Sequence, residues 1–95
     1  MKGDPILYVR RGCNWCREAR NFFATHGISM DIRDVDEDYV HLKRLTEVSG
    51  QANTPTFELD DFIISDFNVA ELIEELDEFP YIKSKLGIQD DEPLG

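Results

Sequence analysis

The sequence predicts an α/β protein with a mixed four-stranded sheet flanked by helices and the element order βαβαββα. Three observations lead to this class: short apolar runs alternate with helical stripes, a helix separates the first two runs, and only two residues separate the last two. A strand-helix-strand unit favours parallel pairing, whereas a two-residue connection requires antiparallel pairing. The 95 residues match the size of one domain, which we expect over residues 1–88, with 89–95 as a polar, frayed tail.

The first strand is expected at residues 6–9, because a continuous apolar run suits a strand that is buried on both faces. A helix is expected from Cys13 onward, since apolar side chains recur there at spacings of three and four until Gly27 stops the pattern. Residues 29–35 alternate apolar and polar side chains, which suits a strand with one exposed face. We therefore place this second strand at an edge of the sheet.

A second helix is expected over residues 36–48, where three acidic residues at the start favour the positive end of the helix dipole. Residues 56–59 and 62–65 are expected to form a β-hairpin across Asp60-Asp61, although two-residue turns seldom use this pair. The apolar stripe of the second helix consists of Tyr39, Val40, Leu42, Leu45 and Val48.

The last helix is expected to begin after Asn68, because Glu71 three positions on completes a capping box. Pro80 should end or kink this helix, and residues 81–86 can add a further helical turn. The expected buried stripe consists of Val69, Leu72, Ile73 and Leu76.

The charge of the chain excludes two classes of partner. The formal net charge of -10 argues against nucleic acid and anionic membranes, because both surfaces would repel the protein. The cysteines nevertheless lie in a basic part of the sequence, since residues 1–33 contain six basic and three acidic residues, and residues 34–95 four and seventeen. Without a leader or a membrane-spanning stretch, a cytoplasmic location is expected, where structural disulfides are scarce.

The pair Cys13 and Cys16 is the main candidate for chemistry, because two cysteines spaced by two residues at a helix start suit a redox-active disulfide. The helix dipole and nearby arginines lower the pKa of Cys13, which makes it the nucleophile. Cys16 would then attack the mixed disulfide on Cys13 and release the reduced substrate. No metal is expected, since His26 and His41 lack the spacing of a zinc site.

The dipeptide Thr54-Pro55 is the second candidate element. A proline directly before a strand has no ladder donor and can adopt the cis form. In a thioredoxin-like arrangement this position faces the cysteine pair, so the backbone of Thr54 can pair with an extended thiol substrate.

Over residues 6–76 the chain resembles the glutaredoxin family, whose fold is thioredoxin-like. The resemblance implies a monomeric cytoplasmic thiol-disulfide oxidoreductase that acts in electron transfer and cell redox homeostasis. Its substrates would be protein disulfides or glutathione mixed disulfides, with glutathione as electron donor and no tightly bound cofactor. Arg10 matches a lysine that holds a glutathione carboxylate, and Trp15 replaces an active-site tyrosine. The residues that carry the resemblance are Tyr8, Cys13-Asn14-Trp15-Cys16, Gly27-Ile28, Ser49-Gly50 and Thr54-Pro55-Thr56.

The segment Ser65-Asp66-Phe67-Asn68 departs from the family pattern of two glycines followed by a pair that receives the γ-glutamyl end. It is similar to NrdH-type redoxins, which take electrons from thioredoxin reductase, and this donor stays an alternative. A third alternative is an iron-sulfur cluster shared by two chains through Cys13 and glutathione. The resemblance implies a substrate-binding set of Arg10, Trp15, Thr54, Pro55, Asp66, Phe67 and Asn68.

Overall fold

The structure, a computed structural model, describes residues 4–88. Within this range no helix combines the length and the apolar character needed to cross a membrane. The expected tail at 89–95 lies outside the described residues. The strands are β1 (Ile6–Val9), β2 (Asp31–Asp34), β3 (Thr56–Leu59) and β4 (Phe62–Ser65), and the helices are α1 (Asn14–Thr25), α2 (Tyr39–Ser49), α3 (Val69–Glu78) and α4 (Pro80–Leu86).

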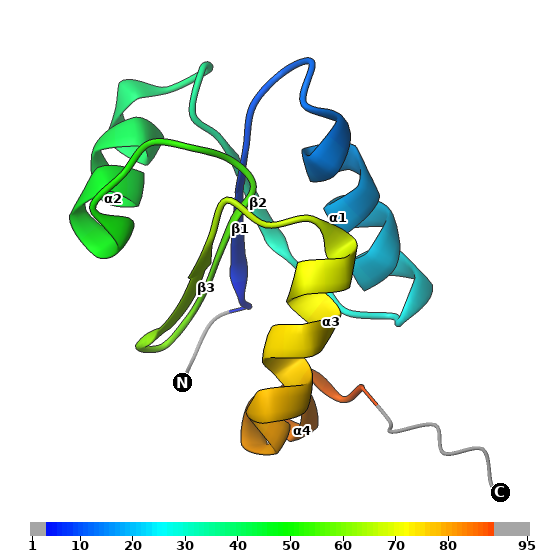
Figure 1. Cartoon of the computed structure of the whole chain (residues 1–95). Helices are drawn as coiled ribbons and strands as arrows, with labels where there is room; N and C mark the ends of the chain where they lie inside the picture. The colour runs from blue at the N-terminus through cyan, green and yellow to red at the C-terminus, as the bar shows by residue number, and fades with distance from the viewer. Residues whose placement is uncertain (1–3, 89–95) are drawn as a thin grey trace, which may run out of the picture.

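The four strands form one sheet in the order β2-β1-β3-β4, with β1 parallel to β2 and β3 antiparallel to both of its neighbours. Helix α2 covers one face of the sheet, and α1 and α3 cover the other (Figure 1). The predicted mixed sheet flanked by helices is therefore confirmed, as is the edge position of β2. The element order is βαβαββαα, because residues 80–86 form a separate helix rather than a last turn.

Strand β1 is apolar throughout because helices pack on both of its faces. Leu7 and Val9 join the larger core cluster, whereas Tyr8 joins Val35 and Leu45 in a smaller cluster under α2. Leu7 and Tyr8 are fully buried, as a strand covered on both faces requires. The larger cluster consists of Leu7, Val9, Cys16, Ala19, Phe23, Phe57, Ile64, Phe67, Leu72, Leu76 and Ile82.

A buried polar network lies under α2. The Tyr8 hydroxyl donates a hydrogen bond of 2.7 Å to Glu58 Oε1, and Arg44 donates one of 2.7 Å to Glu58 Oε2. Glu58 is only 6% exposed, so these two donors satisfy a carboxylate that would otherwise be costly to bury. Burial, followed by the hydrogen bond to Glu58, raises the pKa of Tyr8 from 10.0 to about 12.

This pKa shift predicts a loss of stability in alkali. Folded Tyr8 holds its proton more tightly than the unfolded chain does, so the stability present below pH 10.0 is lost as the pH rises toward about 12. Tyr8→Phe should remove this part of the decline, whereas Tyr39→Phe, at a side chain that is 72% exposed, should keep it. Urea midpoints measured over this pH range would test the assignment, and an equal decline in wild type and Tyr8→Phe would refute it.

Helix α2 starts later than the sequence predicts. Asp34 Oδ1 accepts the backbone N–H groups of Asp36 and Glu37, at 2.8 Å and 3.3 Å, and holds them in a turn before the helix. Asp38 then caps α2 by accepting the N–H of Val40 at 3.0 Å. Two members of the predicted apolar stripe, Tyr39 and Val40, lie at the surface, where they are 72% and 64% exposed.

Two further differences concern the length of β2 and the buried face of α3. Strand β2 covers Asp31–Asp34 rather than 29–35. Ile73 is 44% exposed, so its predicted place in the buried stripe of α3 is wrong. Pro80 does end α3, as predicted, and it occupies the first turn of α4, where a missing N–H costs nothing. The capping box of Asn68 and Glu71 is confirmed.

One end of the sheet gathers the loops that matter below. Val9 at the end of β1 pairs with Asp34 at the end of β2, and Tyr8 pairs with Thr56 at the start of β3. Thr56 in turn pairs with Ser65 at the end of β4. The segments that contain Cys13, Thr54 and Asp66 therefore all meet at this end.

Candidate functional site

Cys13 lies at the N-cap of α1, directly after the turn that follows β1. Gly12 adopts a φ of 76°, a left-handed conformation that costs glycine nothing, and this turn aims Cys13 at the helix start. Cys13 Sγ accepts the backbone N–H of Cys16 at 3.1 Å. The sulfur therefore sits at the positive end of the helix dipole, where negative charge on it is stabilised. The predicted position of Cys13 is confirmed.

Cys13 and Cys16 form a disulfide, with their Cα atoms 5.2 Å apart. The two residues differ in exposure: Cys16 is 3% exposed and belongs to the core cluster, whereas Cys13 is only partly buried and packs against its edge. A partner molecule therefore reaches Cys13 first. The disulfide has an outer and an inner sulfur, which is the asymmetry that an ordered exchange needs.

Thr54 lies next to the outer sulfur. Its carbonyl oxygen is 3.9 Å and its hydroxyl oxygen 3.8 Å from Cys13 Sγ. The Thr54-Pro55 peptide bond is cis, and Pro55 is fully buried. The carbonyl of Pro55 accepts the N–H of Asp66 at 2.9 Å, which connects this segment to the end of β4.

Two other predicted residues lie near the disulfide in sequence. Arg10 donates a hydrogen bond of 2.9 Å to the carbonyl of Ala52 and pairs with Asp36 at 3.4 Å, so it connects the loop after β1 to the segment before Thr54. Trp15 follows in the first turn of α1 and is 44% exposed, which leaves its ring available to a partner.

The segment Ser65-Asp66-Phe67-Asn68 is split between surface and core. Asp66 is exposed, adopts a φ of 54° and accepts a hydrogen bond of 3.4 Å from Asn53 Nδ2. Phe67 is 1% exposed and packs in the core, so its side chain does not line the surface beside the disulfide. Asn68 Oδ1 accepts the N–H of Glu71 at 2.8 Å, and this cap occupies the side chain.

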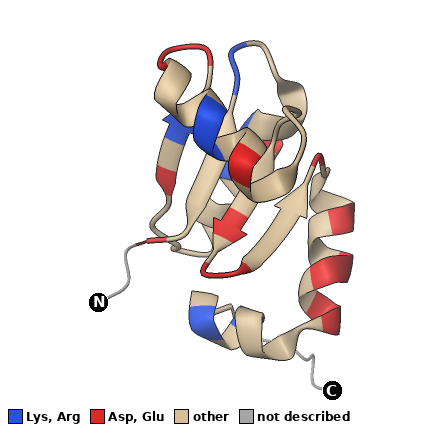
Figure 2. Cartoon of the chain, turned by 90° about the vertical axis from the view of Figure 1, so that its left-hand side faces the viewer, with Lys and Arg blue, Asp and Glu red and all other residues tan. Residues whose placement is uncertain are grey.

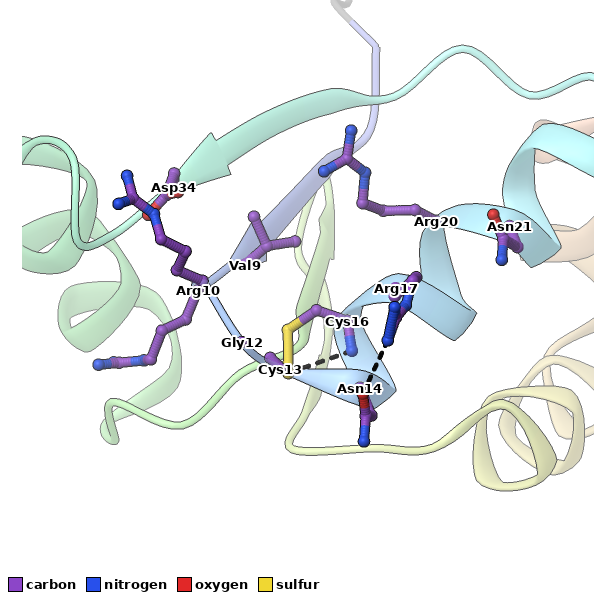
Figure 3. Close-up of a pocket in the computed structure, with 11 residues that line it drawn as sticks. Val9, Arg10, Gly12, Cys13, Asn14, Cys16, Arg17, Arg20, Asn21 and Asp34 are labelled. Atoms are coloured by element: carbon purple, nitrogen blue, oxygen red, sulfur yellow. Dashed lines mark hydrogen bonds between the residues drawn. A yellow bond between two sulfur atoms is a disulfide. The ribbon is translucent and has the colours of Figure 1, made fainter.

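A pocket of about 520 Å³ opens along the disulfide on the side of α1 and β2. Arg17 and Arg20 reach it from α1 and Asp34 from the end of β2 (Figure 3). The sequence shows that the cysteines lie in a basic segment, and Arg17 and Arg20 have the spacing of one helix face. It does not show that the end of β2 with Asp34 lies beside them. The charged residues that line the pocket are Arg10, Arg11, Arg17, Arg20 and Asp34.

Histidines take no part in this grouping. His26 lies at the far end of α1, where its Nδ1 contacts the carbonyl of Phe22 at 2.9 Å. His41 lies on α2, and its Nδ1 is buried without a hydrogen-bond partner within residues 4–88. Within the same residues, no three side chains of the kinds that bind metals come together.

The family model described as Glutaredoxin matches residues 6–64, more than half of the chain. No curated protein gives a significant match.

Solved structures share the fold at low sequence identity. A thioredoxin-like protein is 21% identical, with a TM-score of 0.67 and coverage of 74% of this chain and 96% of that chain. The glutaredoxin from Archaeoglobus fulgidus is 18% identical, with a TM-score of 0.65 and coverage of 78% and 85%. The buckwheat glutaredoxin-glutathione complex is 14% identical, with a TM-score of 0.67 and coverage of 88% and 76%. The thioredoxin-like arrangement is therefore confirmed.

Proposed function

Because the chain belongs to the glutaredoxin family, we propose that it reduces protein disulfides or glutathione mixed disulfides through a dithiol-disulfide cycle of Cys13 and Cys16. Membership of the family implies thiol-disulfide oxidoreductase activity. The observation that carries the proposal is the disulfide at the start of α1, with its outer sulfur beside Thr54. A cytoplasmic location and a monomeric state stay predictions of the sequence.

The cycle begins with both cysteines reduced. The N–H of Cys16 and the dipole of α1 stabilise a thiolate at Cys13, and this lowers its pKa below the usual value of about 8.5. The thiolate attacks one sulfur of a substrate disulfide, forms a mixed disulfide with it, and expels the other sulfur as a thiolate that takes up a proton. Thr54 is positioned to pair with the backbone on either side of the bound cysteine.

The second step uses the inner sulfur. Cys16 loses its proton and attacks Cys13 Sγ, which releases the second substrate thiol and closes the Cys13–Cys16 disulfide. Two electrons have then passed from the protein to the substrate, whose two sulfurs leave as thiols. Two molecules of glutathione restore the dithiol and leave as glutathione disulfide.

We propose glutathione as the donor, bound between the disulfide and the start of α3. A glutathione complex among the similar structures and the position of Thr54 support this choice. Arg10, Trp15 and Pro55 would complete one side of the site. Asp66 and Asn68 would form the other side, where Phe67 acts from the core by positioning the turn.

Thioredoxin reductase is the second candidate donor, and Asp66 is the observation that favours it. An exposed carboxylate at this place repels a glutathione carboxylate, whereas a protein donor need not use the site. Asp66 also adopts a φ of 54°, a conformation that aspartate and asparagine tolerate better than other side chains, so Asp66→Asn removes the charge without backbone strain.

A donor assay decides between the two. NADPH oxidation is followed with a glutathionylated peptide and either glutathione with its reductase or thioredoxin reductase alone. We expect turnover with glutathione, and Asp66→Asn should lower the KM for glutathione by about two- to five-fold, the range of one exposed charge pair. Asp61→Asn, at the other end of the hairpin, should leave this KM unchanged. Turnover with thioredoxin reductase alone would reject the glutathione proposal.

A further inference from the structure

The arginine pocket lies on a different flank of the disulfide from Thr54. Strand β1 leads to Cys13 and lies between β2 and β3 in the sheet. The pocket extends to Asp34 at the end of β2, whereas Thr54 precedes β3. Figure 3 shows Arg17 next to Asn14 at the start of α1 and Arg20 further along the same helix. A substrate held at Cys13 therefore has two separate surfaces beside it.

The pocket carries more positive charge than its neighbours neutralise. Arg10 is engaged by Asp36, and Arg17 donates a hydrogen bond of 2.9 Å to Asn14 Oδ1. Arg11 and Arg20 are exposed and form no ion pair within residues 4–88.

Asp34 is the one carboxylate among the residues that line the pocket, and backbone N–H groups already occupy its Oδ1. Free guanidinium groups beside a reactive sulfur favour an anionic group on the partner.

The positive charge of this pocket contrasts with the negative charge of the rest of the protein. The formal net charge is -10, and acidic residues are concentrated along α3 (Figure 2). At physiological ionic strength, charges more than about 8 Å apart are largely screened, so an anionic group seated among the arginines responds to them rather than to the net charge. The acidic residues of α3 are Glu71, Glu74, Glu75, Asp77 and Glu78.

We infer that the pocket binds acidic side chains of a polypeptide substrate, next to the substrate cysteine that bonds to Cys13; this inference rests on the proposed function. An extended chain advances by about 3.3 Å per residue, so positions close to the substrate cysteine reach from Cys13 into the pocket. If the backbone of the substrate on one side of its cysteine pairs with Thr54, the backbone on the other side of that cysteine continues along Arg11 and Arg20. The pocket affects encounter and binding, and it leaves the electron balance of thiol exchange unchanged.

The test uses three peptides that each contain one internal disulfide and differ only in two residues beside a cysteine, which are Glu, Gln or Lys. The kcat/KM of the reduced protein is measured for each peptide at low and high salt. At low salt we expect kcat/KM to be highest for the Glu peptide, lower for the Gln peptide and lowest for the Lys peptide. Arg11→Gln and Arg20→Gln should each lower the ratio of kcat/KM for the Glu and Gln peptides by about two- to five-fold. Since both peptides react with the same thiol, this ratio cancels any change in thiol reactivity.

The matched control is Lys43→Gln, which removes one exposed positive charge from α2 and should leave the ratio unchanged. Equal kcat/KM for the Glu and Gln peptides in wild type would overturn the inference and leave the proposed function standing. Failure to reduce any of the three peptides would reject the proposed function itself. If Arg11→Gln and Arg20→Gln instead raise the KM for glutathione and keep the peptide ratio, the pocket serves glutathione and the inference is overturned.

Discussion

Cys13→Ser is expected to lower the turnover of disulfide substrates by at least about a thousand-fold, the loss typical when a covalent nucleophile is removed. A serine hydroxyl is not ionised at neutral pH and cannot form the mixed disulfide, so the first step has no substitute. Cys13 is the outer, partly buried residue of the pair, and its loss leaves the core cluster intact. The NADPH-coupled assay with a glutathionylated peptide measures the effect.

Cys16→Ser is the matched control. It removes the inner thiol and keeps the nucleophile, so the mixed disulfide on Cys13 should accumulate and reduction of protein disulfides should stop. Reduction of the glutathionylated peptide should persist in part, because a second glutathione can resolve the mixed disulfide. Because Cys16 is only 3% exposed, its replacement can disturb the core, and circular dichroism checks that the variant is still folded. If Cys13→Ser turned over substrate as fast as the wild type, Cys13 could not be the nucleophile.

Phe57→Ala is expected to lower the free energy of unfolding by about 3 to 5 kcal/mol, as for other large aromatic truncations in cores. Phe57 is fully buried on β3, where its ring stacks on Phe23 with centroids 5.5 Å apart and meets the edge of Phe62 at 6.2 Å. The total free energy of unfolding of a small domain is about 5 to 15 kcal/mol, so the variant loses a large share of its stability.

Urea unfolding measures this loss. Tyr39→Ala, at a side chain that is 72% exposed, should change the free energy of unfolding by less than about 0.5 kcal/mol. A Phe57→Ala variant within about 1 kcal/mol of wild type would contradict the role of this stack in the core.

The sequence predicts the elements well where one local signal decides them. A few neighbouring residues are enough to determine three of these features: the apolar run of β1, the capping box of Asn68 and the end of α3 at Pro80. Side-chain burial is harder, because apolar periodicity identifies a helix face but not whether the sheet extends beneath all of it. Tyr39 lies at the first turn of α2, and its ring remains in solvent.

The candidate site divides in the same way. The cap position of Cys13 follows from its place between a strand and a helix, and the contact with Thr54 follows from the predicted fold. The arginine pocket requires the end of β2 to lie beside α1, which no local pattern contains. The conformation of Asp66 depends on the N–H that it donates to Pro55, a contact between two segments, and the burial of Phe67 depends on the same turn.

The central claim is that Cys13 attacks and Cys16 resolves, and alkylation of the reduced protein tests it most directly. The protein is reduced, treated with limiting iodoacetamide over a range of pH, and the modified cysteine is identified by peptide mass spectrometry. The account predicts that Cys13 reacts first, with an apparent pKa below the usual value of about 8.5, and that Cys16 stays protected. Preferential modification of Cys16, or a Cys13 that reacts only above that pH, would contradict it.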